Sequence, residues 1–132
     1  MPSKLALLIA KNEGFGIAGA TPTRDNNPGD LRHSPHSSHA GEGANDIGEI
    51  DNVADGWADL ERQLALYAGR VIATDPATGQ RCAPRRMTLQ DLAFTYAPPA
   101  DGNPTAGYLA SLCAGLGIDA LASVADALKV QD

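Results

Sequence analysis

The chain has 132 residues, a formal net charge of −6, 43% hydrophobic residues and 5% aromatic residues. This length predicts a single domain over residues 1–132, and the hydrophobic content excludes a disordered chain. Because the acidic balance comes without a basic stripe, we expect no nucleic-acid binding. The apolar run Leu5–Ala10 is shorter than the apolar region of a signal peptide, and no stretch is long enough to span a membrane. We therefore expect a protein made in the cytoplasm without a signal peptide.

The N-terminal segment contains one clear helix signal. Ser3 predicts the N-cap of a helix that runs to about Asn12, and the glycines that follow predict its end. The polar, proline-containing segment 16–45 is predicted to be a long irregular loop, which in a compact domain is usually functional or disordered. Apolar and polar residues alternate over 47–53 well enough to predict a short edge strand, with residues near 31–34 as a candidate hairpin partner.

Helix signals dominate the second half of the chain. Apolar residues recur every three or four positions over residues 54–73 and predict a long helix. Thr88 with Asp91 resembles a capping box, and it predicts a helix through Tyr96 that the following prolines stop.

Two further helices are expected towards the C-terminus. Asn103 followed by Pro104 predicts an N-cap and a helix that ends near Gly117. Asp119 predicts the cap of a final helix, which would carry Leu121, Val124 and Leu128. Taken together, these signals predict an α+β chain that is mainly α, with a small β element after the first helix.

Other polar and reactive residues give weaker signals. Three histidines are spaced by three residues in one loop: His33, His36 and His39. No cysteine accompanies them, so we expect no metal site there and no cofactor elsewhere. The basic run 81–86 is interpreted as a solvated loop, with local binding to a cell wall as the alternative. Cys82 would be an exposed thiol in that loop and Cys113 a small core residue, and whether they pair is left open.

Glu13 is the candidate for acid catalysis. A carboxylic acid protonates a glycosidic oxygen near neutral pH only if its pKa is raised, and burial against apolar groups raises it. Glu13 follows an apolar helix, whose negative C-terminal end also disfavours a carboxylate, and Phe15 lies two residues on. The alternative is a surface glutamate at a frayed helix end.

Four segments occur in a characteristic order. They are Ile-Ala-Lys-Asn-Glu-Gly-Phe at 9–15, Arg-Asp-Asn-Asn-Pro-Gly-Asp-Leu-Arg at 24–32, Gly-Trp-Ala-Asp-Leu at 56–60, and Tyr-Ala-Pro-Pro at 96–99, followed by Asn103, Thr105 and Tyr108. This order resembles the small phage and prophage lysozyme-like domains of the lytic transglycosylase type. The resemblance runs over roughly residues 5–117, and the Asn-Asn-Pro-Gly-x-Leu-Arg string is its most specific part.

The resemblance implies a lysozyme-like α+β fold, with a cleft between a helical lobe and a small β lobe. It also implies that Glu13 matches the catalytic acid of the family, which cleaves the β-1,4 bond between N-acetylmuramic acid and N-acetylglucosamine. The sequence departs from the family pattern at Asp30, where asparagine is usual. Ile47 and Ile50 stand where aromatic residues are more usual, which would loosen sugar stacking.

Several residues are candidates for substrate binding. The amides of Asn26 and Asn27 suit sugar hydroxyl and acetamido groups, although an Asn-Pro-Gly turn explains them equally well. Arg32 would hold a muramyl carboxylate or lactyl-peptide carbonyl, or pair with a neighbouring aspartate such as Asp30. Tyr96 would approach Glu13 or line the cleft, or else be a half-buried aromatic at a helix end. Trp57 lies on an apolar stripe, which favours a core position over a sugar platform.

The number of catalytic carboxylates decides the product. Most glycosidases need two, and Asp30, Glu49 and Asp51 are candidates for the second. An enzyme of the transglycosylase type needs only one, because the N-acetyl group of the substrate stabilises the positive sugar centre. We favour the one-acid mechanism, which leaves a 1,6-anhydro product.

The leading hypothesis is therefore a monomeric enzyme whose partner is the peptidoglycan glycan strand. The alternatives are a hydrolytic lysozyme or endolysin, a chitin-directed glycosidase, and an inactive lysozyme-fold module that binds other virion proteins. Without a signal peptide, the protein would reach the cell wall in a phage particle, through a holin or by a dedicated export machine.

Overall fold

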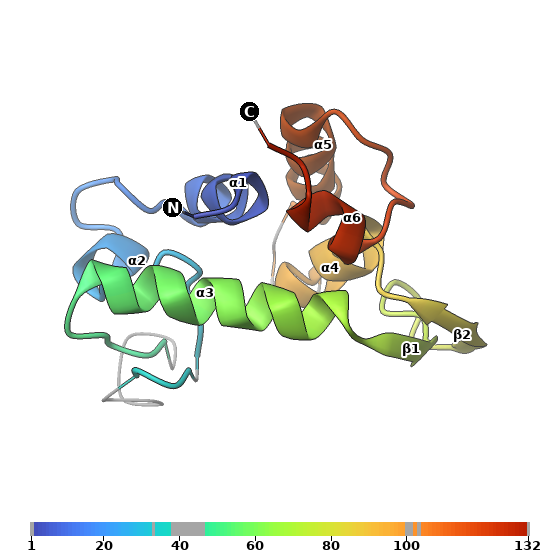
Figure 1. Ribbon diagram of the computed structural model, residues 1–132, viewed down its shortest axis with the longest axis horizontal. Coiled ribbons are helices and arrows are strands. Elements are labelled where there is room, and N and C mark those ends of the chain that lie inside the picture. Colours follow the sequence, from blue (N-terminus) through green and yellow to red (C-terminus); the bar gives the residue numbers. More distant parts are fainter. Residues whose placement is uncertain (1, 33, 38–46, 100–101, 103, 132) are drawn as a thin grey trace. The chain divides into compact units, whose positions relative to one another are not determined.

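The computed structural model describes residues 2–32, 34–37, 47–99, 102 and 104–131. These residues form a mainly helical α+β structure with 48% helix and one two-stranded antiparallel sheet (Figure 1). The predicted fold class is confirmed at this level. The chain divides into two compact units, residues 1–63 and 64–132, which we describe separately. That residues 1–132 form a single domain stays a prediction.

The first unit begins with α1, Lys4–Glu13, whose two predicted caps are confirmed. The Ser3 hydroxyl accepts a hydrogen bond from the Ala6 N–H at 3.1 Å, which satisfies one of the free donors of the first turn. At the other end, Gly14 adopts a left-handed conformation with φ 90°, and its N–H donates to Lys11 O at 3.2 Å. The caps therefore fix Glu13 as the last helical residue.

The segment after α1 contains one short helix, α2, Thr21–Arg24, with Pro22 in its first turn. The predicted strand at 47–53 is wrong: the described residues of this segment form an isolated bridge between Ser37 and Ile50 and no strand. The predicted partner segment is nevertheless adjacent, because the Gly48 N–H donates to Leu31 O at 3.0 Å. Asn52 explains the error, because its side chain accepts the Asp55 N–H at 3.0 Å and thereby begins the next helix.

That next helix, α3, comprises Val53–Ala68 and ends five residues before the predicted end at 73. It is followed by β1, Val71–Thr74, and β2, Arg81–Arg86, which pair antiparallel as a hairpin. The solvated loop predicted for 81–86 is therefore wrong, because this segment is a strand. Three of the four β1 residues are β-branched, and a turn with Gly79 at φ 72° reverses the chain.

The second unit continues with α4, Leu89–Tyr96, and here the predicted capping box is confirmed. The Asp91 N–H donates to Thr88 Oγ1 at 3.1 Å, and the Thr88 N–H donates to the Asp91 carboxylate at 3.0 Å. α4 packs against α5, Thr105–Leu116, and α6, Val124–Leu128. The fully buried side chains of this unit include Leu64, Leu89, Leu92, Leu112 and Val124.

The caps of the last two helices differ from the prediction. Asn103 lies outside the described residues, and Pro104 occupies the N-cap position of α5 without a side-chain cap. α6 is capped by Ser123 instead of Asp119, because the Ser123 hydroxyl accepts the Asp126 N–H at 3.0 Å. Asp119 stabilises the preceding turn, where it accepts the Leu121 N–H at 2.8 Å.

The two cysteines are unpaired thiols, and both are half-buried. Cys82 lies on β2, so it is not the exposed loop residue that the sequence predicts. Cys113 lies on α5, where burial raises the pKa of its thiol and the negative charge of Asp119 raises it further. A half-buried thiol with a raised pKa is a poor nucleophile, which agrees with a packing role for Cys113.

Candidate functional site

Glu13 is half-buried at the C-terminal end of α1, in the first unit. The chain beyond it is held in place, because the Phe15 N–H donates to Ala10 O at 3.0 Å and the Gly16 N–H donates to Thr23 Oγ1 at 2.9 Å. The Phe15 ring meets the Trp57 ring edge-to-face, with 5.3 Å between the centroids. The candidate acid therefore stands beside an ordered turn with an aromatic pair close by in sequence.

The Asn26–Asp30 turn is held by its own amide side chains. Asn26 and Asp30 have positive φ angles, 53° and 51°, which asparagine and aspartate tolerate better than other side chains. Asn26 Nδ2 donates to Ile50 O at 2.9 Å, and this hydrogen bond ties the turn to the segment that leads into α3.

Asn27 is the centre of this turn and is fully buried. Its Nδ2 donates to Leu31 O at 2.7 Å and to Gly48 O at 3.0 Å, and its Oδ1 accepts the Leu31 N–H at 3.0 Å. These bonds to the backbone use the side chain as a structural cross-link. For Asn27, the geometry therefore favours turn chemistry over direct contact with a sugar.

The turn lies directly against α3 at Gly56. A Cβ atom at this position would stand 2.0 Å from Asn26 O and 2.8 Å from Pro28 Cδ, far inside van der Waals contact. Glycine is therefore required there for a close approach of two backbones. The Gly-Trp pair of α3 and the Asn-Pro-Gly string therefore pack against each other. The sequence shows only the order of these two segments along the chain.

Three carboxyl groups interact around the turn: Asp25, Asp30 and Glu49. The pKa of Asp30 is raised to about 6, first by burial and then by the charge of Asp25, against the opposing effect of Arg32. The pKa of Asp25 is also raised, by burial first and then by Glu49, against the effect of Arg24. Because two buried oxygens, Asp25 Oδ2 and Asp30 Oδ1, lack a hydrogen-bond partner among the described residues, ionisation of either group is disfavoured.

A histidine–aspartate pair, which the sequence reasoning missed, joins the loop to α3. The Asp59 side chain is 1% exposed, and its carboxylate accepts the His36 N–H at 2.9 Å and contacts the ring Nδ1 at 2.5 Å. Asp55, one helical turn earlier, lies 3.8 Å from the ring Nε2. The available signal was a pair of aspartates four residues apart on a helix, which places both on one face.

This pair predicts a specific dependence of stability on pH. The hydrogen bond to Asp59 raises the pKa of His36 above its usual 6.5, while burial opposes the rise and the charges of Asp59 and Asp55 add to it. A raised histidine pKa contributes stability that is complete below pH 6.5 and is lost as the pH rises through the folded pKa. We therefore expect His36→Gln to lower the melting temperature at pH 6 but much less at pH 9.

Thermal unfolding of both proteins between pH 5 and pH 9 measures this difference. Burial would raise the pKa of Asp59, but the hydrogen bonds to its carboxylate outweigh burial and keep the pKa below 3.8. Asp59 therefore stays ionised throughout this range, and the change of the melting-temperature difference with pH reflects the protonation of His36. A constant difference in melting temperature across the range would contradict the assignment.

The other predicted residues are distributed over both units. Asn26, Asn27, Asp30, Arg32 and Glu49 belong to residues 1–63, as Glu13 does, and Arg32 and Glu49 are exposed. Tyr96 belongs to the second unit, where it ends α4 and its ring lies 6.3 Å from the ring of Tyr108. Trp57 is half-buried and lines a hollow of about 380 Å³ with Pro2, Ala54, Ala58 and Glu61.

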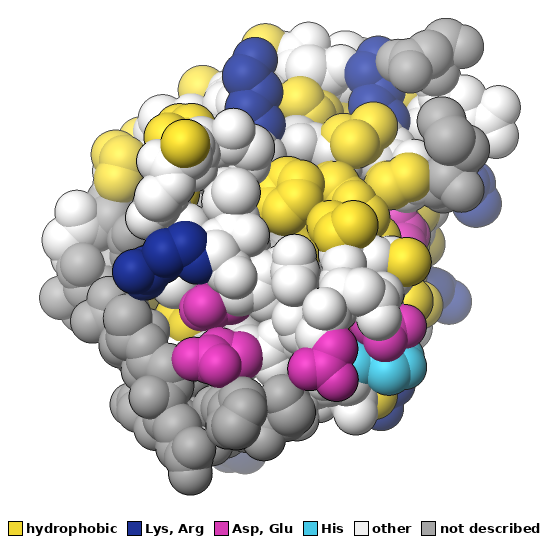
Figure 2. All heavy atoms as spheres, turned by 90° about the vertical axis from the view of Figure 1, so that its left-hand side faces the viewer, with side chains coloured by type: hydrophobic (Ala, Val, Ile, Leu, Met, Phe, Trp, Pro, Cys, Tyr) yellow, Lys and Arg dark blue, Asp and Glu magenta, His cyan; other side chains and the backbone are white. Residues whose placement is uncertain are grey.

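Figure 2 shows part of the polar surface: acidic side chains gather next to a histidine and below a group of hydrophobic side chains. Of the three regularly spaced histidines, His33 and His39 lie outside the described residues. Within the described residues, no three histidine, cysteine or acidic side chains come together as a metal site requires. No helix in the described part of the chain is both long and apolar enough to cross a bilayer.

Comparisons with protein-family models, with curated proteins and with solved structures found no match for this chain.

Proposed function

We propose that the chain cleaves the β-1,4 bond between N-acetylmuramic acid and N-acetylglucosamine in peptidoglycan, with Glu13 as general acid and base. The observation that carries the proposal is the packing of the first unit. Glu13, the Asn26–Asp30 turn and the Gly56–Trp57 segment belong to one compact unit, and the turn is fixed to α3 by close contact at Gly56. Three of the four segments that resemble lytic transglycosylases thus share one folded body.

The position of Glu13 suits proton transfer. It is half-buried at the negative end of α1, and both influences favour the neutral acid that must donate a proton. In the one-acid reaction, the Glu13 proton passes to the glycosidic oxygen as the bond to C1 of the muramyl residue breaks. The acetamido group of the substrate stabilises the positive C1. The Glu13 carboxylate then takes the proton of the muramyl 6-hydroxyl, whose oxygen bonds to C1 and gives a 1,6-anhydro end.

Hydrolysis of the same bond is the second candidate, and Asp30 is the observation that favours it. With a pKa of about 6, the Asp30 carboxyl group is largely ionised at pH 7 and can accept a proton from water. Glu13 would again protonate the leaving oxygen, and the water oxygen would bond to C1 to give a reducing end. This reaction requires two carboxyl groups of the enzyme beside the scissile bond, as in most glycosidases.

Mass analysis of the fragments released from purified peptidoglycan tests the proposal. Anhydro-muramyl ends support the one-acid reaction, whereas fragments heavier by one water support hydrolysis. In the hydrolytic case, Asp30→Asn should remove most of the activity, and in the one-acid case cleavage should continue. Unchanged peptidoglycan after prolonged incubation would refute both reactions, and cleavage of chitin oligomers alone would redirect the assignment to a chitin-directed glycosidase.

A further inference from the structure

One nitrogen of the His36 ring is held by Asp59, and the other faces Asp55. The buried Asp59 carboxylate contacts Nδ1 at 2.5 Å, so in the neutral ring the proton lies on Nδ1 and the lone pair on Nε2. Nε2 lies 3.8 Å from Asp55 Oδ1, which is too long for a hydrogen bond. Nε2 is therefore an electron-pair donor with a set orientation and no hydrogen-bond partner among the described residues.

The Asp55 carboxylate is oriented by Asn52 at the start of α3. Asn52 Nδ2 donates to Asp55 Oδ2 at 2.9 Å, whereas Oδ1 is the oxygen that faces the His36 ring. The His36 and Asp55 side chains are 46% and 40% exposed, so water reaches the space between them. The spacing of the histidines in the sequence does not predict this pair, because its second member lies on α3.

The distance between these two atoms suits a small metal ion. Zinc binds histidine nitrogen at about 2.0–2.1 Å and carboxylate oxygen at about 2.0–2.2 Å, so at a tetrahedral angle the two ligand atoms lie about 3.4 Å apart. The distance of 3.8 Å differs from this value by about 0.4 Å, which a small rotation of either half-exposed side chain removes. Asp59 completes the pattern, because a histidine that binds a metal almost always donates its other ring N–H to a carboxylate, a carbonyl or water.

The charge around this pair attracts cations. Residues 47–61 contain five acidic residues and no lysine or arginine, a net charge of −5. Figure 2 shows acidic side chains gathered beside a histidine on the surface. Such a charge raises the local concentration of cations but provides no fixed position for one. The His36 nitrogen and the Asp55 oxygen provide that position.

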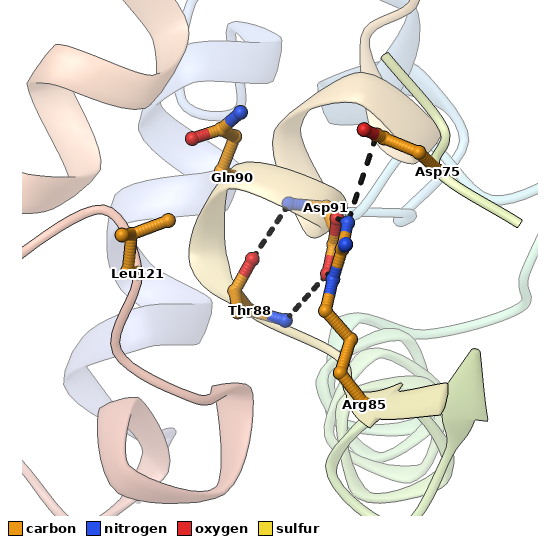
Figure 3. A pocket seen from close by; sticks show the side chains of 6 residues that line it. All are labelled: Asp75, Arg85, Thr88, Gln90, Asp91 and Leu121. Atoms are coloured by element: carbon orange, nitrogen blue, oxygen red, sulfur yellow. Dashed lines mark hydrogen bonds and ion pairs between the residues drawn. The ribbon is translucent and has the colours of Figure 1, made fainter. Parts of the chain in front are cut away.

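The second unit contains a polar cluster that is already neutralised. The Arg85 guanidinium donates to both carboxylate oxygens of Asp91, at 3.2 and 2.7 Å, and lies 3.6 Å from Asp75 (Figure 3). Arginine is always charged, so these two carboxylates need no further cation. At Asp55 and Asp59 the matching cation is the imidazolium of His36, and the ring becomes neutral above its pKa. The neutral ring leaves both carboxylates without this counter-charge and frees Nε2 to bind a metal.

We propose that His36 Nε2 and Asp55 Oδ1 bind one exchangeable Zn²⁺ ion, with water in the remaining coordination positions and Asp59 orienting the ring. Zinc suits this mixed pair better than calcium or magnesium, which prefer oxygen ligands alone. Two protein ligands are fewer than a catalytic or structural zinc site contains, so a chelator should remove the ion readily. Neither ligand takes part in the proposed reaction, so zinc binding and peptidoglycan cleavage can succeed or fail separately.

Calorimetric titration of the metal-free protein with zinc chloride at pH 7.5 tests the site. The parent should bind one zinc ion per chain, and zinc should raise its melting temperature. His36→Gln and Asp55→Asn each remove one of the two ligands and should weaken binding by at least about 10-fold. The matched control, Asp126→Asn, removes a carboxylate at an exposed position of α6 and should bind zinc within about twofold of the parent.

Asp59→Asn tests the orientation of the ring. It should weaken zinc binding by about 10- to 100-fold, as expected for a group that holds a metal ligand in place. In the metal-free neutral ring, NMR should find the proton on Nδ1 in the parent and a mixture of both tautomers in this variant. Because Asp59 is buried, thermal unfolding checks that the variant folds. If it does not fold, His36→Gln and Asp55→Asn still decide whether the site exists.

Equal zinc binding by the parent, His36→Gln and Asp55→Asn would overturn the proposal. Binding that survives in His36→Gln but is lost in His33→Gln/His39→Gln would also overturn it, because the ligands would then be other histidines. Calcium binding as tight as zinc binding, and unaffected by His36→Gln, would show that the acidic surface only attracts cations. That result would equally overturn a zinc site at His36 and Asp55.

Discussion

Glu13→Gln should lower the rate of peptidoglycan cleavage by at least about 100-fold, because the amide of glutamine has no acidic proton to transfer to the glycosidic oxygen. The side chain keeps its size and loses only its acidity, so the half-buried end of α1 should retain its fold. Release of soluble glycan fragments from sacculi measures the rate, and thermal unfolding measures the fold. The expected result is an inactive protein with a melting temperature close to that of the parent.

The matched control for this variant is Asp126→Asn. It makes the same change from carboxylate to amide at an exposed position of α6, where the carboxylate forms an ion pair with Lys129 at 3.8 Å. This variant should cleave peptidoglycan at the parental rate. Near-normal activity of Glu13→Gln would show that another group supplies the proton, and Asp30 would then be the first carboxyl group to test.

Gly56→Ala should destabilise the protein by about 2–3 kcal/mol, the largest effect on stability that we expect from a single methyl group here. The new Cβ would stand 2.0 Å from Asn26 O, and because backbone occupies that space, either α3 or the turn must shift. Thermal or denaturant unfolding measures the loss. Because the shift displaces the Asn26–Asp30 turn, cleavage should also fall in conditions where the variant remains folded.

Gly107→Ala is the matched control for a methyl group added to a helix. Gly107 lies in α5 at an exposed position, and a Cβ there meets no atom within 4 Å. Alanine also restricts the unfolded chain and favours a helix, so this variant should gain about 0.5–1 kcal/mol. Equal and small effects of the two substitutions would contradict the close packing at Gly56.

Local signals predicted the elements whose bonds are local. Ser3 and Gly14 cap α1 as expected, and the Thr88–Asp91 capping box begins α4. In each case the donor and acceptor are within four residues of each other, so the sequence string contains both partners. The predicted helix over 54–73 was too long for a related reason. The β-branched residues after Gly69 fit the apolar period of a helix, but they form β1 and pair with β2, whose partner residues lie seven or more positions further along the chain.

The candidate site depends on partners that are distant in sequence. The hydrogen bond that Asn27 Nδ2 donates to Gly48 O spans 21 residues, and the contact between His36 and Asp59 spans 23. The raised pKa of Asp30 arises chiefly from burial, and the burial of an aspartate cannot be predicted from the residue type alone. Asn26 and Asn27 were correctly singled out, but the choice between turn and substrate contact required the acceptors to be known.

The sequence by itself therefore determined the helical class, the cap at each end of α1 and the position of Glu13 at its end, because each depends on residues within a few positions of one another. The tertiary structure alone decided that the sheet is the 71–86 hairpin and that Asn27 is a buried cross-link. It alone decided that the Asn26–Asp30 turn packs against α3 at Gly56, where a side chain would leave no room. These features depend on burial and on backbone groups brought together across the chain.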